Sequence, residues 1–194
     1  MVAFASIVLA TAGCKRRRGG ADAGAAPSAS AHATHAAALA PPGYVRATVM
    51  DVVPTRAGEA VLLIDEGGAT VLPIFVGGTE ALTIRLRLEG KHYKRPLTHD
   101  LLGDVVRELG GAPVKVQVDD LRDETYFGTA FVERADGTVA ELDARPSDCI
   151  ALALGAKVPI FVKRRVFELA GVPTDDAHDE GRMSGRRKGD PISL

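Results

Sequence analysis

Cysteine is scarce in this sequence, and this limits the kinds of site that it can build. Only Cys14 and Cys149 occur among 194 residues, so we expect no structural disulfide. Structural zinc sites use Cys and His ligands at characteristic spacings, which His92 and His99 do not have. Cys149 lies in the apolar run 149–154, where a small buried hydrophobic residue is the usual role. The sequence therefore indicates neither a zinc site nor a catalytic thiol.

An excess of positive charge is also missing. The formal net charge is −1, and the stretch 44–169 holds 16 Lys and Arg against 19 Asp and Glu, a net charge of −3. Nucleic-acid binders usually present a basic surface, because release of counterions from phosphates drives their affinity. Aromatic residues on which bases could stack mostly fall in predicted strands; the exception is Tyr93, between Lys91 and Lys94. Residues 85–95 are thus either a local basic strip for nucleic acid or a solvated helix face and loop.

Two segments have almost no large apolar side chains. Residues 15–43 begin with four basic residues and continue in Ala, Gly, Ser and Pro, and residues 170–194 show no hydrophobic period. Such segments bury too little apolar surface to offset the entropy of ordering. We therefore predict a disordered linker at 15–43, one domain at 44–169 and a disordered tail at 170–194.

The N-terminal apolar run 2–13 is too short to span a bilayer, which takes about 20 residues. It resembles the apolar part of an export signal and ends at Cys14. The sequence Thr-Ala-Gly-Cys at 11–14 is similar to a bacterial lipobox, although Leu is usual where Thr11 stands. We expect residues 1–14 to be a signal or lipobox-like segment, with lipidation at Cys14 and attachment to the membrane of the cell envelope. A cytoplasmic protein that happens to begin with an apolar run is the alternative.

Hydrophobic periodicity predicts an α+β fold. Runs of β-branched and aromatic residues predict strands, and Gly-containing turns at 66–68 and 135–137 predict hairpins. The expected strands are 44–53, 59–65, 70–76, 114–118, 126–133, 138–142 and 159–162. Helical spacing of apolar residues predicts helices at 79–88, from Thr98 to about 109, at 146–154 and, as a short piece, up to 169. Because the strands come in runs rather than in alternation with helices, we expect one compact domain with a mixed or antiparallel sheet and about three helices.

Polar residues gather where the predicted helices begin. Helix N-termini present free N–H groups and the positive end of the helix dipole, which favour phosphate or acidic side chains. If three such starts converge, they would bring together carboxylates, an imidazole and guanidinium groups. The residues concerned are Glu80, His99, Asp100, Asp143, Arg145 and Asp148.

Several motifs resemble, in order and spacing, those of the bifunctional nuclease domain family. They are Leu-Pro-Ile-Phe-Val-Gly at 72–77 followed by Glu-Ala at 80–81, Arg-Pro-Leu-Thr-His-Asp-Leu-Leu at 95–102, Asp-Ala-Arg-Pro-Ser-Asp at 143–148 and Ala-Leu-Ala at 151–153. The resemblance covers nearly all of 44–169 and implies an α+β fold, hydrolysis of both RNA and DNA, and a homodimer. We therefore predict a nuclease that acts on nucleic acid with little sequence preference.

Phosphodiester hydrolysis needs neutralisation of phosphate charge and either a metal-bound water or a general base. We hypothesise that carboxylates hold one or two divalent cations, Mg²⁺ or Mn²⁺, while His99 acts as the base or orients the water. The predicted metal ligands are Glu80, Asp100, Asp143 and Asp148. The predicted catalytic residues are His99, Asp100, Asp143 and Asp148. The predicted substrate-binding residues are Tyr93, Lys94, Arg95 and Arg145.

A purely structural interpretation of the same residues stays open. Thr98 and Ser147 are ordinary helix-capping residues, and His99 would be a surface histidine. The acidic groups would pair with nearby arginines, Arg95 with Asp100, and Arg145 with Asp143 or Asp148. The protein would then be a non-catalytic binding or assembly module anchored at the cell envelope, which the negative domain charge favours.

Overall fold

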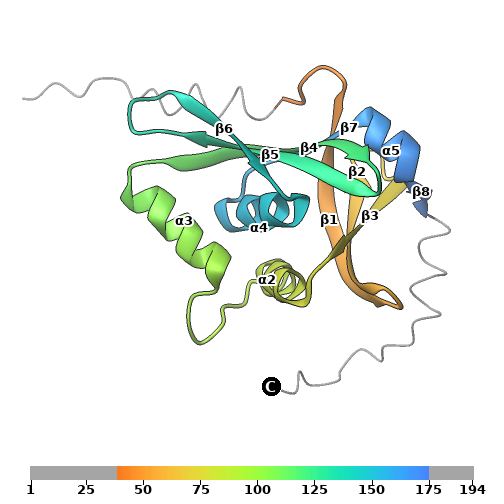
Figure 1. Cartoon of the computed structure of the whole chain (residues 1–194), viewed down its shortest axis with the longest axis horizontal. Helices are drawn as coiled ribbons and strands as arrows, with labels where there is room; N and C mark the ends of the chain where they lie inside the picture. The colour runs from red at the N-terminus through yellow and green to blue at the C-terminus, as the bar shows by residue number, and fades with distance from the viewer. Residues whose placement is uncertain (1–38, 175–194) are drawn as a thin grey trace, which may run out of the picture.

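The computed structural model describes residues 39–174, so Cys14, most of the predicted linker and most of the predicted tail lie outside the described residues. The described chain forms a single sheet with helices packed against it (Figure 1). The strands are β1 (Tyr44–Thr55), β2 (Gly58–Asp65), β3 (Thr70–Val76), β4 (Ala112–Arg122), β5 (Thr125–Glu133), β6 (Val139–Ala144), β7 (Ile160–Lys163) and β8 (Val172–Pro173). The helices are α2 (Gly78–Leu88), α3 (Thr98–Glu108), α4 (Pro146–Ala156) and α5 (Arg164–Ala170).

The sheet combines two antiparallel meanders. Its strand order is β6-β5-β4-β7-β1-β2-β3-β8. Consecutive strands pair antiparallel within β1–β3 and within β4–β6, as expected for strands joined by tight turns. The short strand β7 lies between the meanders, antiparallel to β1 and parallel to β4. In Figure 1 the two meanders run across one another, so the sheet is strongly twisted and bent.

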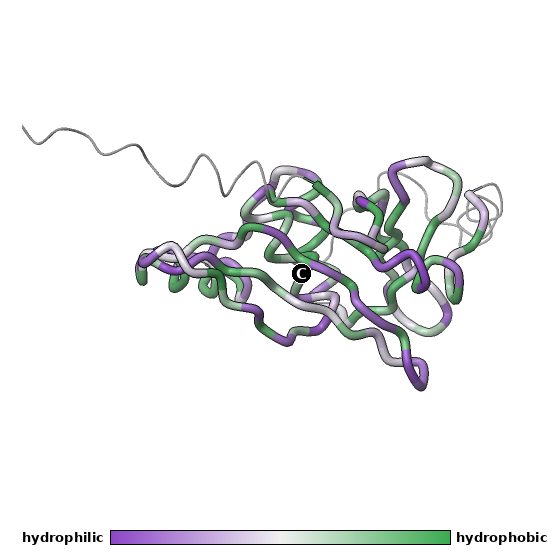
Figure 2. Tube along the Cα trace, turned by 90° about the horizontal axis from the view of Figure 1, so that it is seen from above, coloured by the Kyte–Doolittle hydropathy of each residue, from purple (hydrophilic) through white to green (hydrophobic). Residues whose placement is uncertain are grey.

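Helix α4 is the centre of the core. It packs against β4 and β5 and also contacts α2 and α3. Seven of its residues are buried because its sequence is apolar or small on all sides, and such helices belong inside a protein. Gly128 of β5 allows the close approach, since a Cβ there would lie 3.2 Å from the sulfur of Cys149. In Figure 2 the tube changes repeatedly between hydrophilic and hydrophobic colours along its length. Strand β4 alternates in its sequence, with Val114, Val116 and Val118 separated by Lys115 and Gln117, whereas β2, β3 and β7 contain continuous apolar runs.

The predicted α+β class is confirmed, and the hairpin turns at 66–68 and 135–137 join the expected strands. Cys149 is buried as predicted, and burial raises the pKa of its thiol to about 12. Beyond Leu169 the chain continues in order: β8 pairs with β3, and the backbone N–H of Thr174 donates to the carbonyl oxygen of Ala69. The ordered domain therefore includes residues that the sequence assigned to a disordered tail.

The capping roles suggested for Thr98 and Ser147 are wrong. Helix α3 begins at Thr98 itself, and the N–H of Leu97 is satisfied by the carboxylate of Asp100, at 2.9 Å. The aspartate, in the first turn of the helix, thus reaches back to the N–H of the residue before the helix, as the acidic residue of a capping box does. Helix α4 begins at Pro146, the first-turn position where proline loses no hydrogen bond, and Arg145 precedes it.

Candidate active site

Three helices begin close together on one side of the domain. Glu80 lies in the first turn of α2, His99 in that of α3 and Asp148 in that of α4. The guanidinium group of Arg145 binds both Glu80 and Asp148, and Asp148 in turn binds His99. The three helix starts therefore meet in one hydrogen-bonded network, which we call the Glu80–His99 network after its two ends.

His99 is the buried end of this network. Its side chain is 8% exposed, and its Nε2 lies 2.9 Å from Oδ1 of Asp148. A carboxylate accepts hydrogen bonds, so we infer that the ring proton is on Nε2 and that Nδ1 carries the free lone pair. Nδ1 is buried and has no hydrogen-bond partner within the described part of the chain. Burying a polar atom without a hydrogen-bond partner costs free energy, so such an atom calls for an explanation. A general base that has not yet accepted its proton would have such an atom.

Arg145 holds the acidic members in place. Its Nε donates to Oδ2 of Asp148 at 2.8 Å, and its Nη2 donates to Oδ1 of Asp148 at 2.9 Å and to Oε1 of Glu80 at 2.8 Å. This two-pronged geometry fixes the carboxylate plane of Asp148. Gly77 leaves room for the carboxylate of Glu80 at the start of α2, because a Cβ on that glycine would lie 2.6 Å from Oε2.

The charged groups of the network stabilise one another in their ionised forms. Burial by itself would raise the pKa of Asp148, but hydrogen bonds from Arg145 and His99 outweigh it, so the pKa lies below the ordinary value. The pKa of Glu80 is also lowered, first by a hydrogen bond from its own backbone N–H and then by Arg145, against the effect of burial. Both carboxylates are consequently ionised at neutral pH, and their hydrogen bonds raise the pKa of Arg145.

A second ion pair stands beside the network, between α2 and α3. Nη2 of Arg87 donates to Oδ1 of Asp100 at 2.7 Å, and Nη1 donates to the carbonyl oxygen of Ala151 in α4. Burial alone would raise the pKa of Asp100, but Arg87 and the N–H of Leu97 lower it overall. Asp100 is therefore held through both of its carboxylate oxygens.

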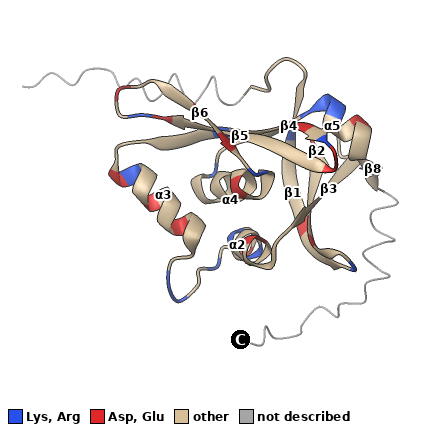
Figure 3. Ribbon diagram, in the orientation of Figure 1, with Lys and Arg blue, Asp and Glu red and all other residues tan. Residues whose placement is uncertain are grey.

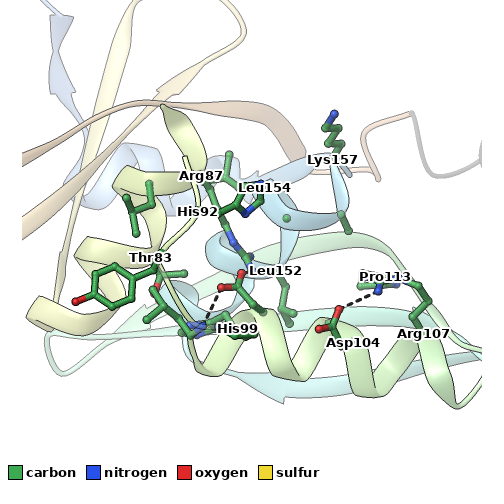
Figure 4. A pocket seen from close by; sticks show the side chains of 18 of the residues that line it. Thr83, Arg87, His92, His99, Asp104, Arg107, Pro113, Leu152, Leu154 and Lys157 are labelled. Atoms are coloured by element: carbon green, nitrogen blue, oxygen red, sulfur yellow. Dashed lines mark hydrogen bonds and ion pairs between the residues drawn. The ribbon is translucent and has the colours of Figure 1, made fainter. Parts of the chain in front are cut away.

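A pocket of about 850 Å³ opens next to His99, between α2, α3 and the end of α4. Figure 4 shows the side chains that line it, including His99, Arg87 and the Asp104–Arg107 ion pair. Its charged lining has four basic and two acidic residues, namely Arg87, Lys91, Arg107 and Lys157 against Asp100 and Asp104. Arg87, Lys91 and Arg107 are paired with Asp100, Glu89 and Asp104. The lining keeps a small positive net charge, opposite in sign to that of the whole domain, which suits a negatively charged ligand.

The sequence model of the bifunctional nuclease domain matches residues 61–175, more than half of the chain. The chain belongs to the bifunctional nuclease domain family. An uncharacterized protein of Mycobacterium tuberculosis is 34% identical to it over 146 residues, 75% of this chain and 87% of that protein. Bifunctional nuclease 1 of Oryza sativa is 27% identical over 108 residues, and Bifunctional nuclease 1 of Arabidopsis thaliana is 28% identical over 134 residues. The matches cover 55% and 63% of this chain but only 33% and 41% of the two plant proteins.

In this bifunctional nuclease domain, the predicted acidic residues do not all meet. Asp148 and Glu80 belong to the Glu80–His99 network, and Asp100 lies beside it in the pocket wall. Asp143 is exposed on β6, opposite Thr129 of β5, and takes no part in the hydrogen bonds of the network. The suggested surface position of His99 is wrong, because its partner Asp148 and the neighbouring helices cover it.

Of the predicted substrate-binding residues, Arg145 lies in the network, whereas Tyr93, Lys94 and Arg95 lie outside it in a loop. Arg145 pairs with Asp148, as the structural interpretation expected, whereas Asp100 pairs with Arg87 and not with Arg95. The loop between α2 and α3 is basic in Figure 3 and carries the exposed residues Tyr93, Lys94 and Arg95. Of these three, Tyr93 lines the pocket.

The residues do not, as arranged, fit the predicted magnesium or manganese site. Between residues 39 and 174 there is no group of three or more His, Cys, Asp and Glu side chains placed to hold a metal ion. The carboxylates of Glu80 and Asp148 are bound to Arg145, and that of Asp100 is bound to Arg87. The divalent cation remains a prediction. Within the same range, no helix has both the length and the apolar composition to cross a membrane.

Proposed function

We propose that this bifunctional nuclease domain hydrolyses phosphodiester bonds of RNA and DNA with little sequence preference, at the pocket beside His99. The observation that carries the proposal is the hydrogen bond of 2.9 Å between His99 and Asp148, in a chain of this family. A histidine held by an aspartate through one ring nitrogen has its other nitrogen oriented for proton transfer. Membership of the family and the positive pocket lining support nucleic acid as the substrate.

Because Nδ1 of His99 is buried in this structure, the proposed reaction requires the neighbouring side chains to move so that a water molecule of the pocket reaches Nδ1 and gives it a proton. The oxygen of this water attacks phosphorus, and the bond between phosphorus and the leaving oxygen breaks. The leaving oxygen takes up a proton from solvent water, and His99 returns the proton it accepted to solvent as the product departs. Asp148 stabilises the imidazolium ion that forms, and Arg145 keeps Asp148 ionised and oriented. The phosphate charge is balanced by cationic side chains of the pocket lining and of the loop with Lys94 and Arg95.

The test compares single substitutions in the purified full-length chain on RNA and on single- and double-stranded DNA. We expect His99→Gln and Asp148→Asn each to lower the hydrolysis rate by about 10²- to 10⁴-fold, the usual contribution of general-base catalysis. Asp123→Asn is the matched control: Asp123 is exposed at a turn with φ +48°, a conformation that asparagine tolerates. All variants are purified in parallel, because a contaminating nuclease would give equal activity in every preparation, and that result would contradict the proposal.

The same assay with EDTA, and then with Mg²⁺ or Mn²⁺ added back, tests the predicted cation. A hydrolysis rate that falls with EDTA and is restored by either metal would support the predicted cation, and the carboxylates would then have to exchange their arginine partners for the metal. If EDTA leaves the rate unchanged, the metal prediction is wrong, while the proposed role of His99 stands or falls with its own substitutions.

The second candidate function is a non-catalytic binding or assembly module at the cell envelope. Its support is an exposed apolar surface on α3 and the residue just beyond it, where Leu101, Val105 and Leu109 are 59%, 45% and 77% exposed. Under this proposal the wild-type chain has no nuclease activity under any of the metal conditions above. The predicted attachment through a lipid on Cys14 is tested by mass spectrometry of the mature N-terminus, and an unprocessed Met1 would contradict it.

A further inference from the structure

We infer that Arg87 is a positioning residue for His99, and that Gly155 is required because it leaves space for the Arg87 side chain. Neither residue touches His99 in the Glu80–His99 network. The inference rests on the proposed role of His99, but its structural part is tested without an activity assay. It goes beyond that role because it explains what fixes the distance between α3, which carries His99, and α4, which carries Asp148.

The guanidinium group of Arg87 connects three helices. It comes from the last turn of α2, and its side chain is only 13% exposed. One nitrogen donates to Asp100 in the first turn of α3, and another donates to the carbonyl oxygen of Ala151 in α4. A charged group with so little exposure is stable only when its hydrogen bonds are satisfied, so these contacts hold the helices together.

Both contacts lie next to the histidine–aspartate pair. Asp100 directly follows His99 in the chain, and its second oxygen accepts the N–H of Leu97, so the first turn of α3 is fixed around it. Ala151 lies three residues after Asp148, about one helical turn along the same side of α4. Arg87 therefore sets the spacing of α3 and α4 within one turn of the hydrogen bond between His99 and Asp148.

Gly155 is the position that makes this arrangement possible. It lies four residues after Ala151 on the same side of α4, and a Cβ there would lie 2.5 Å from Nη1 and 2.7 Å from Cζ of Arg87. Glycine is a poor residue inside a helix because of its backbone freedom, so a helix gains stability when alanine replaces it in open space. In α4 the same replacement would push the guanidinium group away from Ala151 and Asp100.

The experiment observes the ring proton of His99 by NMR in the uniformly ¹⁵N-labelled full-length chain. A proton on Nε2 shared with a carboxylate gives a downfield signal, which His99→Gln identifies by its loss. We expect Gly155→Ala and Arg87→Gln to weaken or abolish this signal in a chain that still folds, with a melting temperature lowered by the loss of the contacts to Asp100 and Ala151. Arg87→Lys, which keeps the charge but can make only one of the two contacts, should give an intermediate result. Gly78→Ala is the matched control, since a Cβ on this residue of α2 meets nothing within 4 Å.

Activity supplies a second measurement. We expect Gly155→Ala to lower kcat by about 10- to 100-fold, the size of effect that a misplaced catalytic group produces. Gly155 and Arg87 also line the proposed substrate pocket, so kcat, and not KM, bears on the inference. Gly155→Ala should add little to Arg87→Gln in the double variant, because both act through the same side chain.

The outcomes separate this inference from the proposed function. If Gly155→Ala keeps both the downfield signal and kcat, the inference is overturned, whatever the wild-type activity. If the wild-type chain has no nuclease activity but the signal is lost in Gly155→Ala, the proposed function fails and the structural inference holds. If Arg87→Gln does not fold, the inference is tested with Gly155→Ala alone. This substitution adds a single methyl group and replaces glycine with a residue of higher helix propensity.

Discussion

Asp148 shows how one side chain depends on its neighbours for its charge. Burial alone would make its ionised form less stable, yet Arg145 and His99 donate to it and lower its pKa. Removing any donor leaves a partly buried carboxylate with too few partners, and removing the carboxylate leaves the donors unpaired. The same balance applies to Asp100, which depends on Arg87 and on the N–H of Leu97.

These lowered pKa values predict how stability depends on pH. A carboxyl group whose pKa is lower in the folded state contributes stability above its unfolded pKa, which is about 3.9 for aspartate, and loses it as the pH falls through the folded value. We therefore expect the free energy of unfolding to fall steeply below about pH 4. In Asp148→Asn the fall should be shallower and the stability at pH 7 lower by about 1–3 kcal/mol.

The measurement is urea unfolding of the wild type, Asp148→Asn and the control Asp123→Asn between pH 7 and pH 3. Equal pH dependence in all three proteins would mean that Asp148 contributes no pH-linked stability.

At the residue scale the sequence reveals some of the site and misses other parts. Glu80, His99 and Asp148 stand at recognisable helix starts, so their residue types and their positions in the chain are enough to indicate a cluster. Arg87 lies at the opposite end of its helix, 13 residues before its partner Asp100, and no local pattern marks such a pair. Asp143 lies in the same short motif as Asp148 but on the strand β6, where it is exposed and makes none of the hydrogen bonds of the network.

Among the elements, α3 stands out because much of its apolar side is uncovered. The exposed large apolar residues of α3 and of the chain just beyond it are Leu101, Leu102, Val105 and Leu109. The edge strand β6 adds Val139 and Leu142, which are 48% and 49% exposed. Contiguous exposed apolar residues usually mark an interaction surface. The predicted homodimer would give this surface a partner.

We expect the full-length chain to sediment as a dimer at micromolar concentration, and the double variant Leu101→Glu/Val105→Glu to sediment as a monomer, because two buried charges disfavour the contact. Analytical ultracentrifugation measures both states. The control is Leu169→Glu, at a residue of α5 that is 56% exposed, which should remain a dimer. A monomeric wild type, or a double variant that still dimerises, would show that α3 is not the dimer contact.

Strands joined by short turns were predictable element by element, because alternating apolar residues and Gly-containing turns are local signals. The place of β7 in the sheet was not predictable from the sequence. Four residues in a row, all but the last buried, reveal that a strand is internal but not which strands flank it. Likewise the two residues of β8 carry too little pattern to predict a strand.

For the whole molecule, the C-terminal limit of the fold can be tested directly. Residues 170–174 pair with β3 and with the turn before it, through Val172 and through both the backbone and the hydroxyl of Thr174. We expect a chain ending at Leu169 to be less stable by about 1–3 kcal/mol, because several hydrogen bonds are lost, and a chain ending at Thr174 to match the full length. Thermal and urea unfolding of the three chains measure this, and equal stability of the two truncated chains would contradict it.

The position of β7 also bears on the order in which the chain becomes structured. Each meander consists of strands that follow one another in the sequence. Such strands pair quickly, because closing the short turn between them costs little chain entropy. Among the described strands, however, the two halves of the sheet are not paired with each other, and β7 is the strand that pairs with both. Side-chain hydrogen bonds from Tyr44 to Asp119 and from Tyr126 to the carbonyl oxygen of Pro73 also join the two halves. As the ribosome delivers this protein, β1–β3 and β4–β6 would therefore exist as separate units, and the native topology would be completed only when this late segment emerges and fills the gap between them.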